Sequence, residues 1–194
     1  MKKYLAFFII FIIFNFHNNA VERVFLPEYD VSDVIISQST EYRTLSGPWA
    51  IFSNQLYEYN DFQKKGIFTP CYTNLPNLWN NIIIDGKKKS SQGYMTLKLD
   101  IIFNENDLNK NLSLQIPEVF SAYRLWLNDD LLASSGEVGI NLESSQAEWK
   151  PQIVDFKIKN VRNTFILQIS NFQYAIGGIW GDIKLGNSSL IHKK

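Results

Sequence analysis

The sequence predicts an all-β fold, an antiparallel β-sandwich with one or two short helices. Apolar and polar residues alternate with period two in several short runs, such as residues 95–101, as they do in strands buried on one face. Polar turns separate at least seven such runs, a pattern typical of antiparallel sandwiches and barrels. The chain lacks the long helical stretches that a doubly wound α/β fold needs between its strands.

The predicted strands follow one another along most of the chain. Residues 34–37 are the candidate first strand, and a Gly-Pro turn at 45–49 leads into the second, at 49–52. Apolar residues at a helical spacing over 56–64 predict one short helix. Further strands are expected at 95–101, 112–116, 123–127, 131–133, 153–158, 165–170 and 179–185. A polar turn at 128–130 predicts a hairpin.

The length of 194 residues is that of one domain, or of two small ones at most. We expect a targeting segment at residues 1–20 and a lead-in segment at 21–44. A single jelly-roll-sized domain then covers 45–187, and a polar tail covers 188–194. No repeat and no low-complexity stretch interrupts this order.

The first residues have the pattern of a signal peptide. Lys2 and Lys3 precede an apolar run at 4–16. As a helix this run is about 20 Å long, shorter than the roughly 30 Å hydrocarbon core of a bilayer. Ala20 offers a small residue for cleavage, but Asn18 stands where a small apolar residue is preferred. The segment is therefore cleaved or kept as an anchor, and either outcome predicts export to the periplasm or to the outer face of the cytoplasmic membrane.

Composition excludes several classes of function. The formal net charge is zero, whereas a nucleic-acid protein needs a basic face. Cys71 is the one cysteine, so the chain forms no internal disulfide and no cysteine zinc site, and it is most simply a small buried residue. His17 and His192 are the two histidines, too few for a histidine metal site, and they offer no base for a catalytic triad. We expect no metal and no cofactor.

Paired carboxylates for sugar hydrolysis are the one catalytic arrangement that stays formally open. Nothing in their spacing singles out a pair, and solvated surface acids are the simpler interpretation. The candidates are Glu118, Glu137, Glu143, Glu148 and Asp182. The Gly177-Gly178 pair lacks the Lys-Ser or Lys-Thr partner of a phosphate-binding loop. We therefore predict that the chain is not an enzyme.

Three segments carry a family resemblance. The first is 92–99, preceded by 75–80; the second is 116–117 with 121–128 and 133–139; the third is 168–172 with 177–180. In this order they resemble the extracytoplasmic sensor domain of bacterial seven-transmembrane receptors with diverse intracellular signalling modules. That domain is similar to the galactose-binding-like jelly roll, which includes the sugar-binding domain of family 2 glycoside hydrolases. The resemblance covers roughly residues 45–186.

The resemblance implies a ligand-binding sensor module for signal transduction. Its ligand would be a carbohydrate or another small molecule, and its partner a membrane receptor with a histidine kinase or a cyclase as output. Gln173 and Tyr174 stand where the family often carries histidine, and Asn128-Asp129 replaces its Asn-Gly turn. Without the seven-helix region the module would be stand-alone, split or truncated. The alternatives are an accessory sugar-binding domain related to family 2 glycoside hydrolases and a non-catalytic protein-interaction sandwich.

Six residues are candidates for ligand contact. Arg124 and Trp126 share one strand face, where the guanidinium could bind a carboxylate or sugar hydroxyls. The alternatives are a surface ion pair for Arg124 and a core position for Trp126. Asn171, Gln173 and Tyr174 form a polar-aromatic loop that is either a ligand contact or a plain loop. Trp180 follows two glycines that permit close backbone approach, either to a ligand or within a tight turn.

Overall fold

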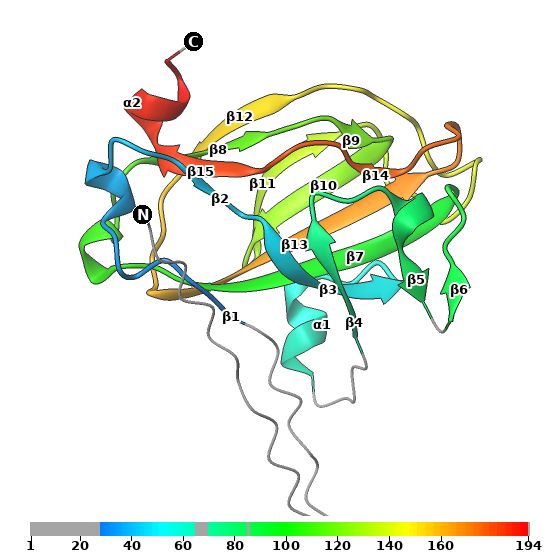
Figure 1. Cartoon of the computed structure of the whole chain (residues 1–194), viewed down its shortest axis with the longest axis horizontal. Helices are drawn as coiled ribbons and strands as arrows, with labels where there is room; N and C mark the ends of the chain where they lie inside the picture. Colours follow the sequence, from blue (N-terminus) through cyan, green and yellow to red (C-terminus); the bar gives the residue numbers. More distant parts are fainter. Residues whose placement is uncertain (1–27, 65–69, 85, 194) are drawn as a thin grey trace, which may run out of the picture.

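The computed structural model describes residues 28–64, 70–84 and 86–193. It confirms the all-β prediction, because two antiparallel sheets pack face to face and helices are short (Figure 1). The predicted targeting segment at 1–20 lies outside the described residues. Within the described part, no helix is both long and apolar enough to cross a membrane.

The large sheet has the strand order β11-β10-β13-β7-β3-β4, and its neighbours are antiparallel. A further strand, β1 (Glu28–Asp30), pairs in parallel with the end of β7. In sheet order the strands are β11 (Asp130–Ser135), β10 (Ala122–Leu127), β13 (Arg162–Asn171), β7 (Gly93–Ile102), β3 (Gly47–Ser53) and β4 (Cys71–Leu75).

The small sheet lies along the top of the view in Figure 1 and has the order β12-β8-β15-β2. Its strands are β12 (Gln152–Phe156), β8 (Leu112–Ile116), β15 (Lys184–Asn187) and β2 (Arg43–Thr44). The remaining strands form two antiparallel pairs. One pair is β14 (Gly178–Ile179) with β9 (Val119–Phe120), and the other is β5 (Ile83–Ile84) with β6 (Lys87–Lys88). The helices are α1 (Tyr59–Gln63) and α2 (Ser188–Ile191), with single 3-10 turns η1 (Ile36–Gln38), η2 (Trp79–Asn81) and η3 (Glu105–Asp107).

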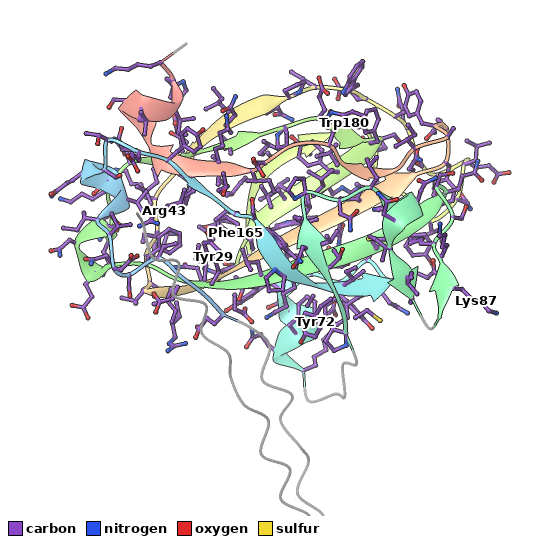
Figure 2. All side chains as sticks on the ribbon, in the orientation of Figure 1. Tyr29, Arg43, Tyr72, Lys87, Phe165 and Trp180 are labelled. Carbon is purple, nitrogen blue, oxygen red and sulfur yellow. The ribbon has the colours of Figure 1, made fainter. Side chains whose placement is uncertain are left out.

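The core lies between the two sheets, where the period-two pattern places every second side chain. Phe165 of β13 and Phe156 of β12 meet edge to face across the layers, with ring centroids 6.3 Å apart. Phe165, labelled in Figure 2, is fully buried. The other inward side chains include Met95, Leu97, Leu99 and Ile101 of β7, and Leu112, Leu114 and Ile116 of β8. This buried apolar surface is the main driving force for the fold.

The outer face of the large sheet is covered in part by the segment that contains α1. The hydroxyl of Thr96 accepts the backbone N–H of Tyr57 at 2.8 Å, and the Gln168 side chain donates to the Tyr57 carbonyl at 3.0 Å. Thr96 and Gln168 are consequently buried although they point away from the core. Helix α1 confirms the helix predicted within 56–64 and begins with a capping box between Glu58 and Asp61.

The prediction of a first strand at 34–37 is wrong. Ile36–Gln38 form η1, because the buried carboxylate of Asp107 accepts the backbone N–H groups of Ile36 and Ser37, each at 2.8 Å. Those N–H groups are then unavailable for hydrogen bonds to a neighbouring strand. The predicted strand at 179–185 is divided into β14 and β15.

Residues on either side of 45–187 also belong to the packed structure. The segment expected as a lead-in supplies β1 and β2 to the two sheets. In the segment expected as a polar tail, α2 packs on β15 and buries Ile191.

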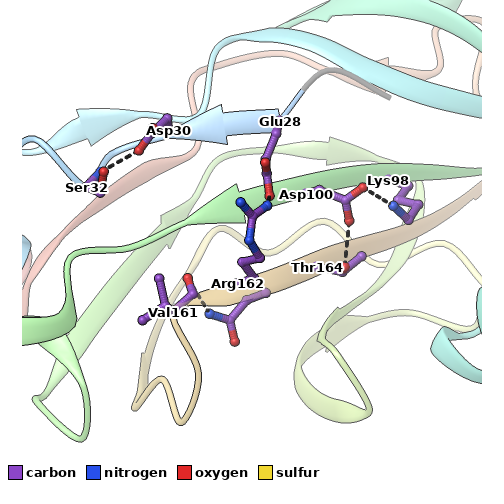
Figure 3. A network of polar contacts seen from close by, with 9 residues as sticks. Glu28, Asp30, Ser32, Lys98, Asp100, Val161, Arg162 and Thr164 are labelled. Carbon is purple, nitrogen blue, oxygen red and sulfur yellow. Dashed lines mark hydrogen bonds and ion pairs between the residues drawn. The ribbon is translucent and has the colours of Figure 1, made fainter. Parts of the chain in front are cut away.

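Strand β1 is held by polar contacts at its edge (Figure 3). Arg162 of β13 forms an ion pair with Glu28, and Asp30 accepts the backbone N–H of Ser32 at 2.9 Å. On the neighbouring β7, Asp100 binds both Lys98 and the hydroxyl of Thr164. The Glu28–Arg162 pair thus joins the start of the described chain to the central strand β13.

Candidate functional site

Exposed apolar side chains gather in the loops at one end of the sandwich. Six of the eleven large apolar residues that are exposed in the described structure belong to the loop between β11 and β12 or to the segment after β13. They are Ile140, Leu142, Trp149, Tyr174, Ile176 and Trp180, each between 40% and 61% exposed. Such a concentration on a surface is typical of a binding site.

Phe120 lies at the centre of an aromatic cluster in these loops. Its ring centroid is 5.8 Å from that of Trp149, 6.3 Å from that of Tyr174 and 6.2 Å from that of Trp180. The rings of Tyr174 and Trp180 both stand edge-on to Phe120, an arrangement that aromatic pairs favour. Figure 2 shows Trp180 at the upper edge of the molecule, away from Tyr29 and Arg43. We call these four residues the aromatic cluster.

Asn171 and Gln173 hold the loop that carries Tyr174. Asn171 is fully buried, and its amide nitrogen donates to three backbone carbonyls, those of Ser91, Tyr174 and Ile176. Gln173 donates to the carbonyl of Ser145 at 2.9 Å, which ties this loop to the one between β11 and β12. Asn171 thus positions the loop that carries Tyr174.

Trp180 also forms one wall of an open cleft with a volume of about 270 Å³. The opposite wall is the turn between β4 and η2. The lining residues are Pro76, Asn77, Leu78, Asn81, Ile179 and Trp180. Backbone hydrogen bonds fix the two walls, from Trp79 N–H to the Gly177 carbonyl at 2.9 Å and from Ile179 N–H to the Asn77 carbonyl at 3.0 Å.

The two glycines before Ile179 allow these walls to meet. A Cβ on Gly177 would lie 2.7 Å from the ring of Trp79, and one on Gly178 would lie 2.6 Å from the Asn77 carbonyl oxygen. Gly178 also has a φ of +112°, which L-residues with side chains rarely adopt. The Gly-Gly pair therefore allows the opposite wall of the cleft, at Asn77 and Trp79, to approach the backbone closely.

Arg124 and Trp126 are on the same strand face, as predicted, and both are partly exposed. That face is the outer side of the large sheet, and neither residue lines the cleft. The Arg124 guanidinium is 3.5 Å from the Glu137 carboxylate. In register beside it, the buried side-chain oxygen of Gln168 has no hydrogen-bond partner within the described residues. The structure thus brings Tyr174 and Trp180 together around Phe120 and keeps Arg124 and Trp126 on another surface.

The cleft is uncharged. None of its lining side chains is ionisable. The backbone carbonyl of Glu118 accepts the Trp180 N–H at 3.1 Å, and Asp182 accepts the hydroxyl of Ser46 at 2.9 Å. The ammonium of Lys89 lies 4.9 Å from the ring centroid of Trp79, and burial lowers the pKa of Lys89.

Two further groupings of reactive side chains were compared with known catalytic arrangements within the part of the chain that the structure describes. Across residues 28–64, 70–84 and 86–193, no three His, Cys, Asp or Glu side chains are placed to hold a metal ion. Ser113, Asp155 and His192 meet on the small sheet, but Ser113 donates to Asp155, and the His192 ring contacts the same carboxylate at 2.9 Å. A nucleophile relay needs a serine-to-histidine bond instead. Two hydrogen bonds lower the pKa of Asp155, and the one from Ser113 has a larger effect than the one from His192.

Sequence reasoning missed part of this site. Phe120, Asn77 and Asn81 were not candidates, although Asn77 lies in a segment that carries the family resemblance. Trp149 was a weak candidate in a loop, because its segment reads mainly as the entry to a strand. An aromatic residue next to a polar turn is a weak signal, and the two asparagines lack even that. Only the folded chain shows that 76–81, 120, 149 and 174–180 share one end of the sandwich.

No family model and no curated protein sequence matches this chain. Solved structures do, and β-glucuronidases are among them. The enzyme from Ruminococcus gnavus aligns with a TM-score of 0.55 at 12% identity over 75% of this chain and 28% of its own. The enzyme of an uncultured Clostridium species aligns with a TM-score of 0.55 at 13% identity, over 75% of this chain and 28% of its own. The enzyme from Faecalibacterium prausnitzii aligns with a TM-score of 0.54 at 12% identity, over 75% of this chain and 31% of its own.

At this identity the similarity concerns the fold alone. The chain spans less than a third of the length of these three enzymes.

Proposed function

We propose that this chain is an exported ligand-binding module that binds carbohydrate and catalyses no reaction of its own. The observation that carries the proposal is the cleft of about 270 Å³ beside Trp180. Trp180 is 58% exposed, and Phe120 holds its ring on one side. An exposed aromatic ring offers a flat apolar surface to the apolar face of a sugar, and the asparagines opposite can bond to its hydroxyls.

Support for a non-catalytic role comes from the side chains at the site. Glycoside hydrolysis needs two carboxyl groups that flank the scissile bond. The cleft residues include two asparagines and no acid. Binding could still act on a partner, because a ligand that prefers one state of a receptor shifts the population of that state. On this proposal the partner is a membrane receptor with a kinase or cyclase output.

Immobilised plant and bacterial polysaccharides provide the first test. The purified protein should bind a subset of them, and Trp180→Ala should lose that binding while it keeps the wild-type melting temperature. Tyr42→Ala is the matched control, because Tyr42 is 47% exposed and packs under Lys184 on the small sheet. Failure of every polysaccharide to retain the protein would exclude this function.

Export is tested separately, by fusing alkaline phosphatase to the end of the chain in a bacterial host. That enzyme folds only where its disulfides form, so activity is expected only if the fusion leaves the cytoplasm. Deletion of residues 1–20 should abolish the activity. An active fusion without those residues would contradict the proposed signal peptide.

A protein-interaction role is the second candidate. Ile140 and Leu142 are 57% and 61% exposed in the loop between β11 and β12, and aliphatic side chains contribute little to sugar recognition. If this role holds, Leu142→Ser should reduce association in sedimentation velocity of concentrated protein. An unchanged sedimentation coefficient, with polysaccharide binding intact, would favour the carbohydrate role.

A further inference from the structure

The cleft beside Trp180 is small for a ligand site. Pockets for drug-sized molecules span about 300–1,000 Å³, so a cleft of about 270 Å³ has room for a single ring. Three lining residues, Pro76, Leu78 and Ile179, are apolar. The cleft therefore suits a compact ligand that has one apolar face.

The polar groups of the cleft are neutral. Asn77 uses its amide nitrogen to bind the hydroxyl of Thr73 at 2.8 Å. Asn81 is exposed at the other end of the same wall, and among the described contacts its side chain makes no hydrogen bond. An amide offers both donors and an acceptor, which matches the hydroxyl groups of a sugar.

Charges around the cleft disfavour an anion. A carboxylate that leaves water needs a cation or several donors in compensation. The ammonium of Lys89 is stacked on Trp79, which does not line the cleft. Two of the residues that contact or flank Trp180 are acidic, Glu118 through its backbone carbonyl and Asp182 two positions later in the chain. The exposed guanidinium of Arg124 lies instead on the outer face of the large sheet.

From this arrangement we infer that the cleft binds a neutral pyranose ring, with Trp180 as the stacking surface and Asn81 as the hydroxyl partner, and rejects uronic acids. The inference rests on the proposed function and specifies its ligand. It separates this chain from the glucuronidases that share its fold, because the ligand selected here lacks the carboxylate of a glucuronide.

Matched sugar pairs test the selectivity. Glucose and glucuronic acid, and galactose and galacturonic acid, differ only in a hydroxymethyl group against a carboxylate. Binding is measured by titration of the wild-type protein with each sugar, followed by the indole N–H signals in NMR spectra. At least one neutral sugar should bind about tenfold or more tightly than its uronic acid. Equal or tighter binding of the uronic acids would overturn the inference.

Variants test the location. Trp180→Ala and Asn81→Ala should each weaken neutral-sugar binding by about tenfold or more. Tyr42→Ala and Arg124→Ala should leave it within about twofold, since neither residue lines the cleft. Loss of binding in Arg124→Ala with full binding in Trp180→Ala would place the site on the sheet face and refute the inference. If no sugar of either kind binds, the proposed function fails together with the inference.

Discussion

Asn171 binds both backbone polar atoms of Tyr174. Its side-chain oxygen accepts the Tyr174 N–H at 3.1 Å, and its side-chain nitrogen donates to the Tyr174 carbonyl at 2.9 Å. The same nitrogen also bonds to Ser91 and Ile176, so one buried amide fixes the path of the loop below the aromatic cluster. A residue expected to touch a ligand thus shapes the surface that the ligand would meet.

Replacement of Asn171 by alanine should destabilise the protein by roughly 2–4 kcal/mol, because it leaves several buried backbone groups without partners. Equilibrium unfolding in urea measures the change. Asn74→Ala is the matched control, since Asn74 is exposed on the edge strand β4 and should cost no more than about 0.5 kcal/mol. Similar losses in both variants would mean that Asn171 does not hold the loop.

Asp107 should be the most sensitive carboxylate in the fold. It is fully buried and accepts two backbone N–H groups from η1, each at 2.8 Å. Asp107→Ala should lower the unfolding free energy by about 3 kcal/mol, as hydrogen bonds to a charged group are worth about 1.5–3 kcal/mol each. Asp33→Ala serves as the control, because its pair with Arg43 is exposed and should contribute less than about 1 kcal/mol. Both values come from chemical denaturation at neutral pH.

The attachment of α2 should weaken in acid. Bonds from Ser113 and His192 lower the pKa of Asp155 from its ordinary value of 3.8. A lowered pKa in the folded state means that the unfolded chain binds the proton more readily. The stabilisation is therefore complete above about pH 4 and is lost as the pH falls through the folded-state pKa. Melting temperatures of the wild type and of Asp155→Asn, recorded from about pH 2 to pH 6, should converge at the acid end. Parallel curves would contradict this role.

Replacement by alanine should have different effects at two glycines that have similar φ angles. Gly47 has a φ of +127° and open space at its Cβ position, so Gly47→Ala should cost about 1–3 kcal/mol through strain alone. Gly178 has a φ of +112° and would also bring its Cβ to 2.6 Å from the Asn77 carbonyl. Gly178→Ala should therefore cost more than Gly47→Ala and should separate the walls of the cleft. Thermal unfolding compares the two, and equal losses would show that the Asn77 contact is unimportant.

Much of the fold followed from local patterns. The alternation over 95–101 and 112–116 predicted β7 and β8, and the polar turn after Leu127 predicted the hairpin. Asn128 serves that turn without the usual glycine, because it adopts a φ of +54° itself. The segment at 34–37 failed for a tertiary reason, since Asp107, about 70 positions away in the chain, captures the N–H groups that a strand would need.

The candidate site was less predictable. Tyr174 was recognised as a candidate because it belongs to a polar-aromatic loop, and Trp180 because it follows a Gly-Gly pair. Arg124 and Trp126 were correctly placed on one strand face, yet period two cannot tell whether that face meets a loop, a helix or solvent. Phe120 carried only a weak signal, although the rings of the cluster surround it.

By itself the amino-acid sequence determined the all-β class, most strand positions and the faces that are buried, since these depend on neighbours a few residues apart. Tertiary structure alone decided that the turn after β4 lies against Trp180, and that Asn171 supports the loop from within. Those relations depend on contacts between segments about 80 to 100 residues apart, whose geometry is set by the packing of the sheets and not by local propensity.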